Sequence, residues 1–544
     1  MSLSSSTPFE DAASAMALAS SAASLTVADA FRSQVVLRAG AIALECGRRR
    51  WTYAELDGRS TQLAQALAAR GVQRGDRIAM LSENRPEYVE LLLAAAKLGA
   101  IVACQNWRQA DSELSHCLRL VDPALIVVSP RFTETLARVW QRSTPTLLLG
   151  DAYDDALTAA SQAPSTDSSL DLGLDLDGEE GLLILYTSGT TGLPKAALIS
   201  HRAMVARGLV HAIDRRVDPH AAFIAWSPLF HMGATDATFA SLMGGGKVIV
   251  MDGFDAQALA ELVGRERIGH LTIVPGVVDK FLAALKSGGV VVREVGVVGV
   301  MADLVPPKQI AELTAALRAP YCNTFGSTET GSPPASKGLI GVGVAPEHLA
   351  KRQNSLCIVR LVDEQGNEVP DGEPGELTMR GPTLFSGYWG APQVNAEVFR
   401  NGWYHMGDML MRTPDGLLAF VDRKKYLIKS GGENIYPAEI ERVLMAVPGV
   451  TEAAVVRRRD ERWGEVPVAF VVRRDPALTE AMLIDACRGA IANYKLPKEV
   501  RFLTAEALPR NVSGKVERRL LEALLEALLD EPPPRQRLPS EGAP

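Results

Sequence analysis

Short apolar runs alternate with amphipathic segments along most of this chain, and this alternation limits the possible fold more than any other feature. Before residue 150, strands are predicted at 77–81, 126–128 and 146–149, and helices at 51–68 and 86–98. After residue 195, strands are predicted at 223–226, 247–250 and 270–274, and a helix at 255–266. The alternation predicts an α/β protein whose largely parallel sheets carry helices on both faces.

The two ends and the last hundred residues differ from this pattern. With 544 residues the chain exceeds a single core, and two to four structural units are expected. Residues 151–180 are acidic and rich in Ser and Ala, which predicts a solvated connection. A β-rich section is predicted at 355–385. The C-terminal part predicts a compact α+β unit, with helices near 438–446, 480–492 and 516–528 and strands near 452–457 and 466–472.

Composition excludes several classes of partner. The chain is 47% hydrophobic and 22% charged, and its net charge of -7 gives no basic footprint for nucleic acid or an anionic membrane. No basic residue precedes Arg32 and no stretch is long and apolar enough to span a bilayer, which argues against a signal peptide and a membrane span. The cysteines form no C-x-x-C pair and indicate free thiols in a reducing compartment, so we expect a cytoplasmic protein.

One loop has the composition of a phosphate cradle. The apolar run Leu182–Leu185 leads into a loop that reads Tyr186, Thr187, Ser188, Gly189, Thr190, Thr191, Gly192, Leu193, Pro194, Lys195. Glycines let backbone N–H groups approach an oxyanion, hydroxyls add donors, and Lys195 adds a positive charge. Pro194 before the lysine and Ala196 after it exclude a Walker A motif. The alternative interpretation is a Ser- and Thr-rich surface turn.

A second candidate site is the run Asn323, Thr324, Phe325, Gly326, Ser327, Thr328, Glu329. A carboxylate beside hydroxyls suits a Mg²⁺ ion that bridges phosphate oxygens, because hard cations prefer oxygen ligands. The ring of Phe325 is a candidate for stacking on a nucleobase. A strand end followed by an ordinary turn would explain the same residues without a ligand.

Three further segments carry charge next to glycine. Asp408 follows Gly407 and is a candidate to accept both hydroxyls of a ribose. Residues 422–441 are dense in charge and glycine, and Pro437 is suited to the first turn of a helix. Lys515 follows a flexible turn near the C-terminal end. Taken singly, these segments are also explained by a common turn, a basic hairpin and a solvated lysine.

Together and in this order, the five segments resemble the motifs of the adenylate-forming superfamily, which contains acyl-CoA synthetases, adenylation domains and firefly-type luciferases. The resemblance covers residues 26–529. It implies a large N-terminal domain of two βα-layered subdomains plus a β-barrel-like subdomain, and a small mobile α+β lid. The expected divisions are a loosely ordered N-terminus (1–25), an ATP- and acid-binding domain (26–424), a lid (425–529, hinge at Lys425) and a disordered tail (530–544).

The resemblance implies ATP, Mg²⁺ and coenzyme A as co-substrates and cofactor, and it assigns the ATP site. The loop of Thr187, Ser188, Gly189, Thr190, Thr191, Gly192 and Lys195 would hold the β- and γ-phosphates. Asn323 and Phe325 would contact adenine, and Asp408 and Arg423 the ribose. Thr328 and Glu329 would face the α-phosphate and the Mg²⁺ ion, with Glu329 at the metal, and Gly326 and Ser327 are further expected ATP-binding residues. Lys515 would bridge the acid's carboxylate and the α-phosphate, where two anions must approach each other.

The resemblance also implies a second step on the same site. Rotation at Lys425 would withdraw Lys515 and bring Lys429, Ser430, Gly431 and Gly432 over the site, so that the pantetheine arm of coenzyme A could enter. Trp463 and Tyr494 stand where related enzymes touch the coenzyme A nucleotide. His231 matches a gate between the acid and thiol channels, with a buried core histidine as the alternative.

The acyl pocket is expected at His231, Met232, Gly233, Val300, Met301 and Ala302. Many acyl-CoA synthetases carry Gly-Gly-Ala-Pro at the wall where this chain has residues 298–304, and side chains in place of glycines should shorten the pocket. The Met301 and Asp303 pattern resembles synthetases of benzoate-type acids. An aromatic, alicyclic or medium-length monocarboxylate is therefore the expected substrate. These wall segments show no Lys or Arg for a second carboxylate.

The leading prediction is an acid:CoA ligase that forms AMP and pyrophosphate and acts as a monomer or homodimer. An alternative is an adenylation enzyme that loads a carrier protein. Amino-acid activators usually place an aspartate directly after the gate position, where this chain has Met232, although Asp236 lies further on. A third possibility is a binding protein that kept the fold and lost the chemistry. Glu329, Asp408, Arg423 and Lys515 argue against it.

Overall fold

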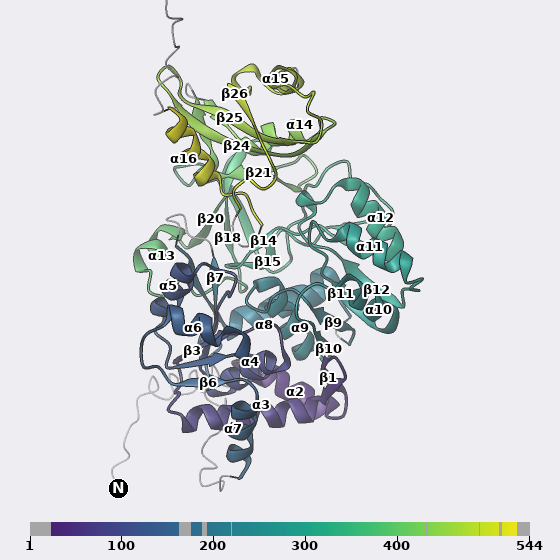
Figure 1. Ribbon diagram of the computed structural model, residues 1–544, viewed down its shortest axis with the longest axis vertical. Helices are drawn as coiled ribbons and strands as arrows, with labels where there is room; N and C mark the ends of the chain where they lie inside the picture. The colour runs from purple at the N-terminus through teal and green to yellow at the C-terminus, as the bar shows by residue number, and fades with distance from the viewer. Residues whose placement is uncertain are drawn as a thin grey trace, which may run out of the picture. The chain divides into compact units, whose positions relative to one another are not determined.

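The structure is a computed structural model that describes residues 23–162, 176–187, 193–218, 220–430, 433–488, 490–510 and 514–529. The predicted disordered tail and nearly all of the predicted loose N-terminus lie outside these residues. Within them the chain forms three larger sheets of five, six or eight strands before residue 424, a two-stranded hairpin, and a five-stranded C-terminal sheet (Figure 1).

The six-stranded sheet is parallel except at one edge, where β7 and β8 pair in antiparallel. Its strands, in order across the sheet, are β6 (Thr146–Leu148), β5 (Leu125–Val128), β3 (Arg77–Leu81), β4 (Ile101–Cys104), β7 (Gly181–Thr187) and β8 (Lys195–Ser200). The central strands are buried on both faces, which is why they read in the sequence as continuous apolar runs.

The eight-stranded sheet is parallel in its centre and has an antiparallel strand at each edge. Its order is β16 (Leu339–Ile340), β13 (Tyr321–Cys322), β12 (Glu294–Val298), β11 (Arg267–Leu271), β9 (Ala222–Ala225), β10 (Lys247–Val250), β1 (Ile42–Cys46) and β2 (Arg49–Thr52). Buried side chains from β9, β11 and β12 pack with α11 and α12 into one apolar cluster. The carboxyl ends of these parallel strands share one edge, where α/β sheets bind ligands.

Helices connect and cover the two sheets. They are α2 (Val27–Arg38), α3 (Tyr53–Ala69), α4 (Pro86–Leu98), α5 (Asp111–Val121), α6 (Thr133–Val139), α7 (Asp151–Gln162), α8 (His201–Arg215), α9 (Met232–Gly244), α10 (Ala256–Arg265), α11 (Val278–Ser287) and α12 (Pro307–Leu317). Their starts follow local chemistry. Thr52 caps α3 and forms a capping box with Glu55, and Pro86 occupies the first turn of α4.

The β-rich section forms a further five-stranded sheet of β17 (Ile358–Val362), β18 (Pro374–Arg380), β20 (Trp403–Arg412), β19 (Phe399–Arg400) and β21 (Leu418–Arg423), with α13 (Pro392–Val398) before β19. The C-terminal sheet contains β23 (Glu433–Ile435), β22 (Ile428–Ser430), β25 (Gly464–Arg473), β24 (Val450–Asp460) and β26 (Glu499–Leu503). The helices α14 (Pro437–Met445), α15 (Glu480–Cys487) and α16 (Arg518–Leu529) pack against it.

The chain divides into two compact units. Unit 1 comprises the described residues of Met1–Val359, Thr378–His405 and Asp415–Leu418, and unit 2 those of Arg360–Leu377, Met406–Pro414 and Ala419–Pro544. The predicted fold class is confirmed: two βα-layered sheets precede a β-rich sheet and a small α+β part. The domain boundary at Lys425 stays a prediction.

Three of the local predictions were wrong in part. Residues 151–162 form α7 rather than a solvated connection, because Tyr153, Ala156 and Leu157 share one buried face while the acidic residues face water. The strand expected at 270–274 lies at Arg267–Leu271, and the helix expected at 480–492 ends at Cys487. In the last two cases the composition indicated an element but not its limits, which tertiary packing sets.

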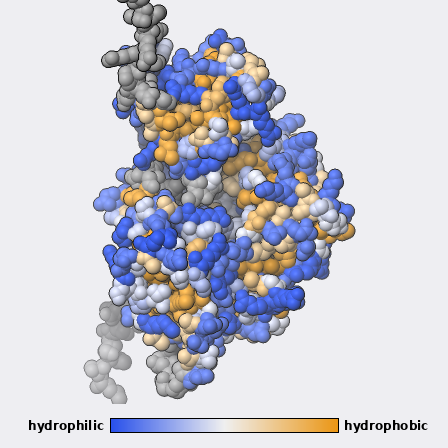
Figure 2. Space-filling view, viewed as in Figure 1, coloured by the Kyte–Doolittle hydropathy of each residue, from blue (hydrophilic) through white to orange (hydrophobic). Residues whose placement is uncertain are grey.

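Hydrophilic and hydrophobic residues are mixed over the face drawn in Figure 2. The mean hydropathy of the chain is +0.05. Within the described part of the chain, no helix combines the length and the apolar character that crossing a bilayer requires.

Candidate active site

The predicted phosphate loop joins the two arms of an antiparallel hairpin. Thr187 ends β7 and Lys195 begins β8, and the two residues are register partners. The predicted residues between them, Ser188, Gly189, Thr190, Thr191 and Gly192, lie outside the described residues. A Walker A loop leads from a strand into a helix, so the hairpin agrees with the exclusion of that motif from the sequence.

Lys195 and Glu329 both contact Tyr388, a residue that the sequence motifs did not indicate. The Lys195 Nζ lies 4.9 Å from the centroid of the Tyr388 ring, and the Tyr388 hydroxyl donates to Glu329 Oε1 at 2.7 Å. Glu329 is only 8% exposed. Tyr388 reaches this place because its segment runs beside β8, with Trp389 N–H donating to the Ala196 carbonyl at 2.8 Å. The glycines and aromatic rings of Phe385–Gly390 were the available signal.

A tight hairpin shapes the segment that ends at Glu329. Gly326 and Ser327 form β14, which pairs with β15 (Gly331–Pro334). A Cβ at Gly326 would lie 2.1 Å from the Gly331 carbonyl oxygen, so only glycine fits there. Thr330, which the sequence analysis did not select, accepts the Ser327 N–H at 3.0 Å and donates to the Pro333 carbonyl at 2.6 Å. Ser327, Thr328 and Glu329 are therefore presented on a fixed turn.

Asn323 is held by a buried lysine. It follows β13 at the carboxyl edge of the eight-stranded sheet, and its Oδ1 accepts from Lys351 Nζ at 2.7 Å. Lys351 Nζ also lies 2.6 Å from an Asp303 oxygen. Burial lowers the pKa of Lys351, and the Asp303 charge opposes this. Asn323 Nδ2 donates to the carbonyls of Leu349 and Ala350, so its predicted contact with adenine stays a prediction.

The predicted acyl-pocket residues lie at the same sheet edge in two groups. His231, Met232 and Gly233 begin α9 after β9, and Val300, Met301 and Ala302 follow β12. The second group has a fixed bend: Gly299 has φ +81° and Met301 has φ 52°. A Cβ at Gly299 would overlap the Tyr321 ring, whose hydroxyl donates to the Val300 carbonyl at 2.8 Å.

The segment 298–304, predicted to form the wall of the acyl pocket, contacts the segment 323–329, predicted to bind the nucleotide. Met301 N–H donates to Thr324 Oγ1 at 2.9 Å, next to Phe325. Met301 holds a left-handed backbone that non-glycine residues rarely adopt, which is typical of residues fixed at functional sites. Phe325 is half-buried, and its N–H donates to Ser336 Oγ at 2.9 Å.

Asp236, which left open an amino-acid substrate, forms a buried ion pair. Its Oδ1 lies 3.3 Å from Arg207 Nη1, and the two side chains are 2% and 0% exposed. Burial raises the pKa of Asp236, and Arg207 opposes that rise. Arg207 also donates to the Thr328 carbonyl at 3.0 Å and to the Thr383 carbonyl at 3.1 Å. The pair thus ties α8 and α9 to the Glu329 turn.

Four predicted residues come together in unit 2. Arg423 Nε lies 2.5 Å from Asp408 Oδ1, and Asp408 is 2% exposed. The Lys515 side chain keeps contact with solvent. Partial desolvation by the surrounding protein nevertheless lowers its pKa, and the nearby positive charges of Arg423 and Lys425 lower this pKa further. Asp408 acts in the opposite direction. One negative and three positive groups therefore lie close together. They come from β20, β21, the turn after β21 and the C-terminal segment.

Lys425 lies in a short 3-10 turn, Lys424–Tyr426. The residues on either side of it make side-chain contacts. Lys424 Nζ lies 2.8 Å from Glu376 Oε2. The Arg518 guanidinium lies 4.5 Å from the Tyr426 ring and 2.6 Å from Glu441 Oε1. The turn is therefore held on both sides of Lys425.

The predicted coenzyme A residues form two groups in unit 2. Ser430 pairs with Gly464, which places Lys429 and Ser430 beside Trp463. Tyr494 lies in a separate 3-10 turn, Asn493–Lys495. Trp463 and Tyr494 are 41% and 43% exposed, and each lies near a cationic side chain, Arg462 and Lys495 respectively. Gly431 and Gly432 lie outside the described residues.

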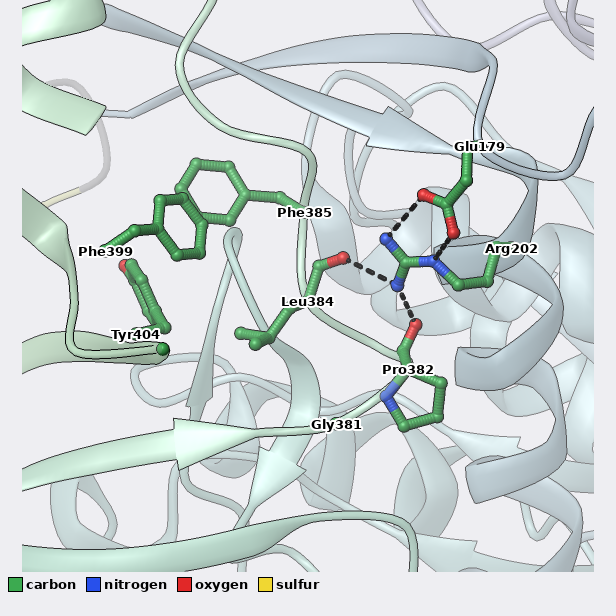
Figure 3. Close-up of a pocket in the computed structure, with 9 residues that line it drawn as sticks. Glu179, Arg202, Gly381, Pro382, Leu384, Phe385, Phe399 and Tyr404 are labelled. Carbon is green, nitrogen blue, oxygen red and sulfur yellow. Dashed lines mark hydrogen bonds and ion pairs between the residues drawn. The ribbon is translucent and has the colours of Figure 1, made fainter. Parts of the chain in front are cut away.

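A surface pocket of about 480 Å³ lies in unit 1, and Figure 3 draws the residues that line it. The Arg202–Glu179 ion pair lines one side, and the rings of Phe385, Phe399 and Tyr404 line the other. Its lining includes none of the predicted site residues that the structure describes. The pocket adjoins the predicted site, because the N–H of Phe385 donates to the Glu329 carbonyl at 2.8 Å.

Comparison with known proteins identifies the family. A family model described as AMP-binding enzyme matches residues 31–389, and a model of the AMP-binding enzyme C-terminal domain matches residues 439–515. The chain belongs to the AMP-binding enzymes. This AMP-binding enzyme is 35% identical over 507 residues to an indoleacetate–CoA ligase from Aromatoleum aromaticum, a match that covers 89% of this chain and 94% of the relative.

Another curated relative and two solved structures are similar to this chain over nearly its whole length. A feruloyl-CoA synthase from Amycolatopsis is 34% identical over 484 residues, covering 88% of this AMP-binding enzyme and 94% of the relative. Among solved structures, ATP-bound MatB from Rhodopseudomonas palustris has a TM-score of 0.77 and 27% identity, covering 93% of this chain and 100% of that one. The o-succinylbenzoate CoA synthetase (MenE) from Bacillus subtilis, in complex with an acyl-adenylate, has a TM-score of 0.76 and 26% identity, covering 91% and 97%.

Proposed function

We propose that this AMP-binding enzyme is an ATP-dependent acid:CoA ligase. It joins a carboxylic acid to ATP to form an acyl-adenylate and pyrophosphate, and it then transfers the acyl group to the thiol of coenzyme A, which breaks the acyl–phosphate bond and releases AMP. The observation that carries the proposal is the end-to-end similarity to CoA ligases, which extends over both the ATP-binding part and the C-terminal part. The proposed substrate is an aromatic, alicyclic or medium-length monocarboxylate.

The proposed first step requires cations where two anions meet. Lys515 is the proposed donor to the acid's carboxylate and the α-phosphate, and Asp408 and Arg423 are the proposed contacts of the ribose. The shared position of these three residues in unit 2 supports this division of work. Lys195 and the preceding loop are the proposed ligands of the β- and γ-phosphates.

Glu329 fits the proposed Mg²⁺ ion. It is a buried carboxylate on a fixed turn beside the hydroxyls of Ser327 and Thr328, and oxygen ligands of this kind suit Mg²⁺. No cluster of three His, Cys, Asp or Glu side chains able to hold a metal is found among the described residues. One carboxylate together with ATP phosphates is a common way for proteins to hold this ion. When bound, the ion would neutralise charge on the phosphates. Tyr388 would orient Glu329.

In the proposed second step, residues of unit 2 other than Lys515 serve the reaction. Rotation at Lys425 is proposed to move Lys515 away and to bring Lys429 and Ser430 to the reacting carbonyl. Trp463 and Tyr494 are the proposed contacts of the coenzyme A nucleotide. Their exposed rings beside Arg462 and Lys495 support this role, because such groups can stack on a base and pair with phosphates.

The ion pair of Asp236 bears on the alternative that an amino acid is activated. A carboxylate that binds a substrate amine has to face the substrate, whereas Asp236 is occupied by Arg207. This observation favours an acid without an α-amine. We further propose a cytoplasmic monomer or homodimer; the free state of all six thiols supports a reducing compartment.

The test uses purified full-length protein with ATP, Mg²⁺ and a panel of carboxylic acids. Acid-dependent pyrophosphate exchange without coenzyme A measures the first step, and thioester formation with coenzyme A measures the second. We expect both. Exchange without a thioester would point to a carrier-protein acceptor, and no exchange with any acid would reject the proposed chemistry.

A further inference from the structure

Four polar side chains are buried together at the carboxyl edge of the eight-stranded sheet. His211 and Arg215 lie one turn apart on α8, His270 lies near the end of β11, and Ser332 lies on β15. Each is between 5% and 7% exposed. His270 hydrogen-bonds the carbonyl of Gly299, at 3.1 Å, in the segment where the acyl-pocket wall is proposed. The cluster therefore lies where α/β sheets bind ligands.

Hydrogen bonds connect the members of the cluster. Arg215 Nη2 donates to Ser332 Oγ at 2.8 Å, and Ser332 Oγ lies 3.4 Å from His211 Nε2. The rings of His211 and His270 are 6.4 Å apart. Burial and the charge of Arg215 lower the pKa of His270 to about 3, and burial also lowers the pKa of His211. Both histidines are therefore neutral near pH 7.

Arg215 forms no ion pair with the residues that the structure describes, although its charge interacts with that of the buried Asp236. Among the described residues no carboxylate lies within ion-pair distance of it, and the buried Asp236 nearby is paired with Arg207. The neighbouring Asp214 is engaged by Asn354 and Ser355. A buried guanidinium that bonds only a neutral hydroxyl is costly, because its lost hydration is not replaced.

Two buried atoms in this cluster lack a hydrogen-bond partner among the described residues: Arg215 Nε and His270 Nδ1. Their chemistry differs. Arg215 Nε carries a hydrogen and can only donate. His270 Nε2 must carry its proton to bond the Gly299 carbonyl, so Nδ1 of the neutral ring can only accept. The cluster therefore has one unused donor and one unused acceptor among the described residues.

We propose that this cluster recognises a hydroxyl on the acyl group of the substrate, remote from the reacting carboxylate. A neutral phenolic hydroxyl accepts a hydrogen bond from Arg215 Nε and donates its proton to His270 Nδ1, and the guanidinium interacts favourably with the partial negative charge on the hydroxyl oxygen. A carboxylate would satisfy Arg215 but would face the lone pair of His270. The inference rests on the proposed acid:CoA ligase function, and it narrows the substrate to hydroxylated aromatic acids.

The test compares acids in matched sets: benzoate, 4-hydroxybenzoate and terephthalate; phenylacetate and 4-hydroxyphenylacetate; cinnamate and 4-hydroxycinnamate. The kcat/KM of pyrophosphate release is measured for each. We expect the hydroxylated member of at least one set to be preferred by about 10- to 100-fold, the range for a hydrogen bond to a charged group. Equal rates within every set, or preference for terephthalate, would overturn the inference. Failure with every acid would instead reject the proposed function.

Variants separate recognition from a structural role. Arg215→Leu should lose the preference while keeping kcat/KM for the unsubstituted acid within a few-fold. Its thermal unfolding midpoint should be unchanged or higher, because an unpaired buried charge is removed. Arg202→Leu, a half-buried arginine of the same helix that pairs with Glu179, should keep the preference. His270→Phe, which removes the acceptor, should reduce the preference as well. A lower midpoint for Arg215→Leu with equal losses for all acids would show that Arg215 is structural.

Discussion

Lys515 is the residue on which the proposed adenylation depends. Substitution by alanine removes its ammonium group and should lower acyl-adenylate formation by roughly 10²- to 10³-fold. Transfer from supplied acyl-adenylate to coenzyme A should stay near the wild-type rate, because Lys515 is proposed to have left the site by then. The two half-reactions are measured separately. Equal loss in both would contradict the assigned role.

The pH dependence of adenylation follows from the environment of the same lysine. Desolvation by surrounding protein, then Arg423 and Lys425, lowers its pKa below that of a free lysine. The cationic form is the active one and is fully present below this pKa. Adenylation should therefore fall as the pH rises through the lowered pKa, earlier than ordinary lysine chemistry predicts. Lys515→Arg should move this alkaline limb to higher pH, and an unmoved limb would assign it to another group.

Glu329 offers a test in which shape and charge are separated. Glutamine keeps an oxygen that can accept from the Tyr388 hydroxyl but loses the negative charge. Glu329→Gln should lower pyrophosphate exchange by roughly 10²- to 10³-fold and raise the Mg²⁺ concentration needed. Tyr388→Phe keeps the ring under Lys195 and removes one hydrogen bond, worth about 1 kcal/mol, so its loss should be only several-fold. An unchanged Mg²⁺ requirement in Glu329→Gln would argue against the metal role.

At the scale of elements, the Arg207–Asp236 pair joins α8 to α9 beneath the Glu329 turn. Arg207→Met leaves a buried carboxylate without its partner and should cost about 3–5 kcal/mol in the free energy of unfolding. The double variant with Asp236→Leu should recover much of this loss. Urea unfolding measures both, and Arg202→Met on the same helix is the control, because Arg202 is half-buried and its partner Glu179 is exposed. Additive losses would show that the two side chains are not coupled.

The sequence predicted helices and strands well where apolar residues mark a buried face, and poorly where many acidic residues concealed such a face. The strand at 77–81 and the helix at 86–98 have the predicted limits, because both are buried except at one terminal residue. The acidic face of α7 concealed its buried stripe around Tyr153. Motif residues were found because glycines and hydroxyls mark close backbone approach. Lys351 and Arg207 could not be found, since a cation in a polar stretch looks solvated until the fold buries it.

At the scale of the whole molecule, the proposed cycle depends on rotation at Lys425. Lys425→Pro fixes one backbone dihedral angle and should resist that rotation. We expect near-normal pyrophosphate exchange and a strongly reduced rate of thioester formation. The measurement is single-turnover transfer of a preformed acyl-adenylate to coenzyme A, with Lys425→Ala as the matched control. A full thioester rate in Lys425→Pro would remove the hinge from the proposal.

The position of Lys351 has a practical consequence for redesign. One buried ammonium is shared between Asp303, in the segment proposed to shape the acyl pocket, and Asn323, in the segment proposed to hold the base of ATP. Mutating the first segment to admit a larger acid therefore disturbs a support of the second. Libraries aimed at new acids should be screened at several ATP concentrations, because variants with the desired pocket would otherwise be discarded for weakened nucleotide affinity.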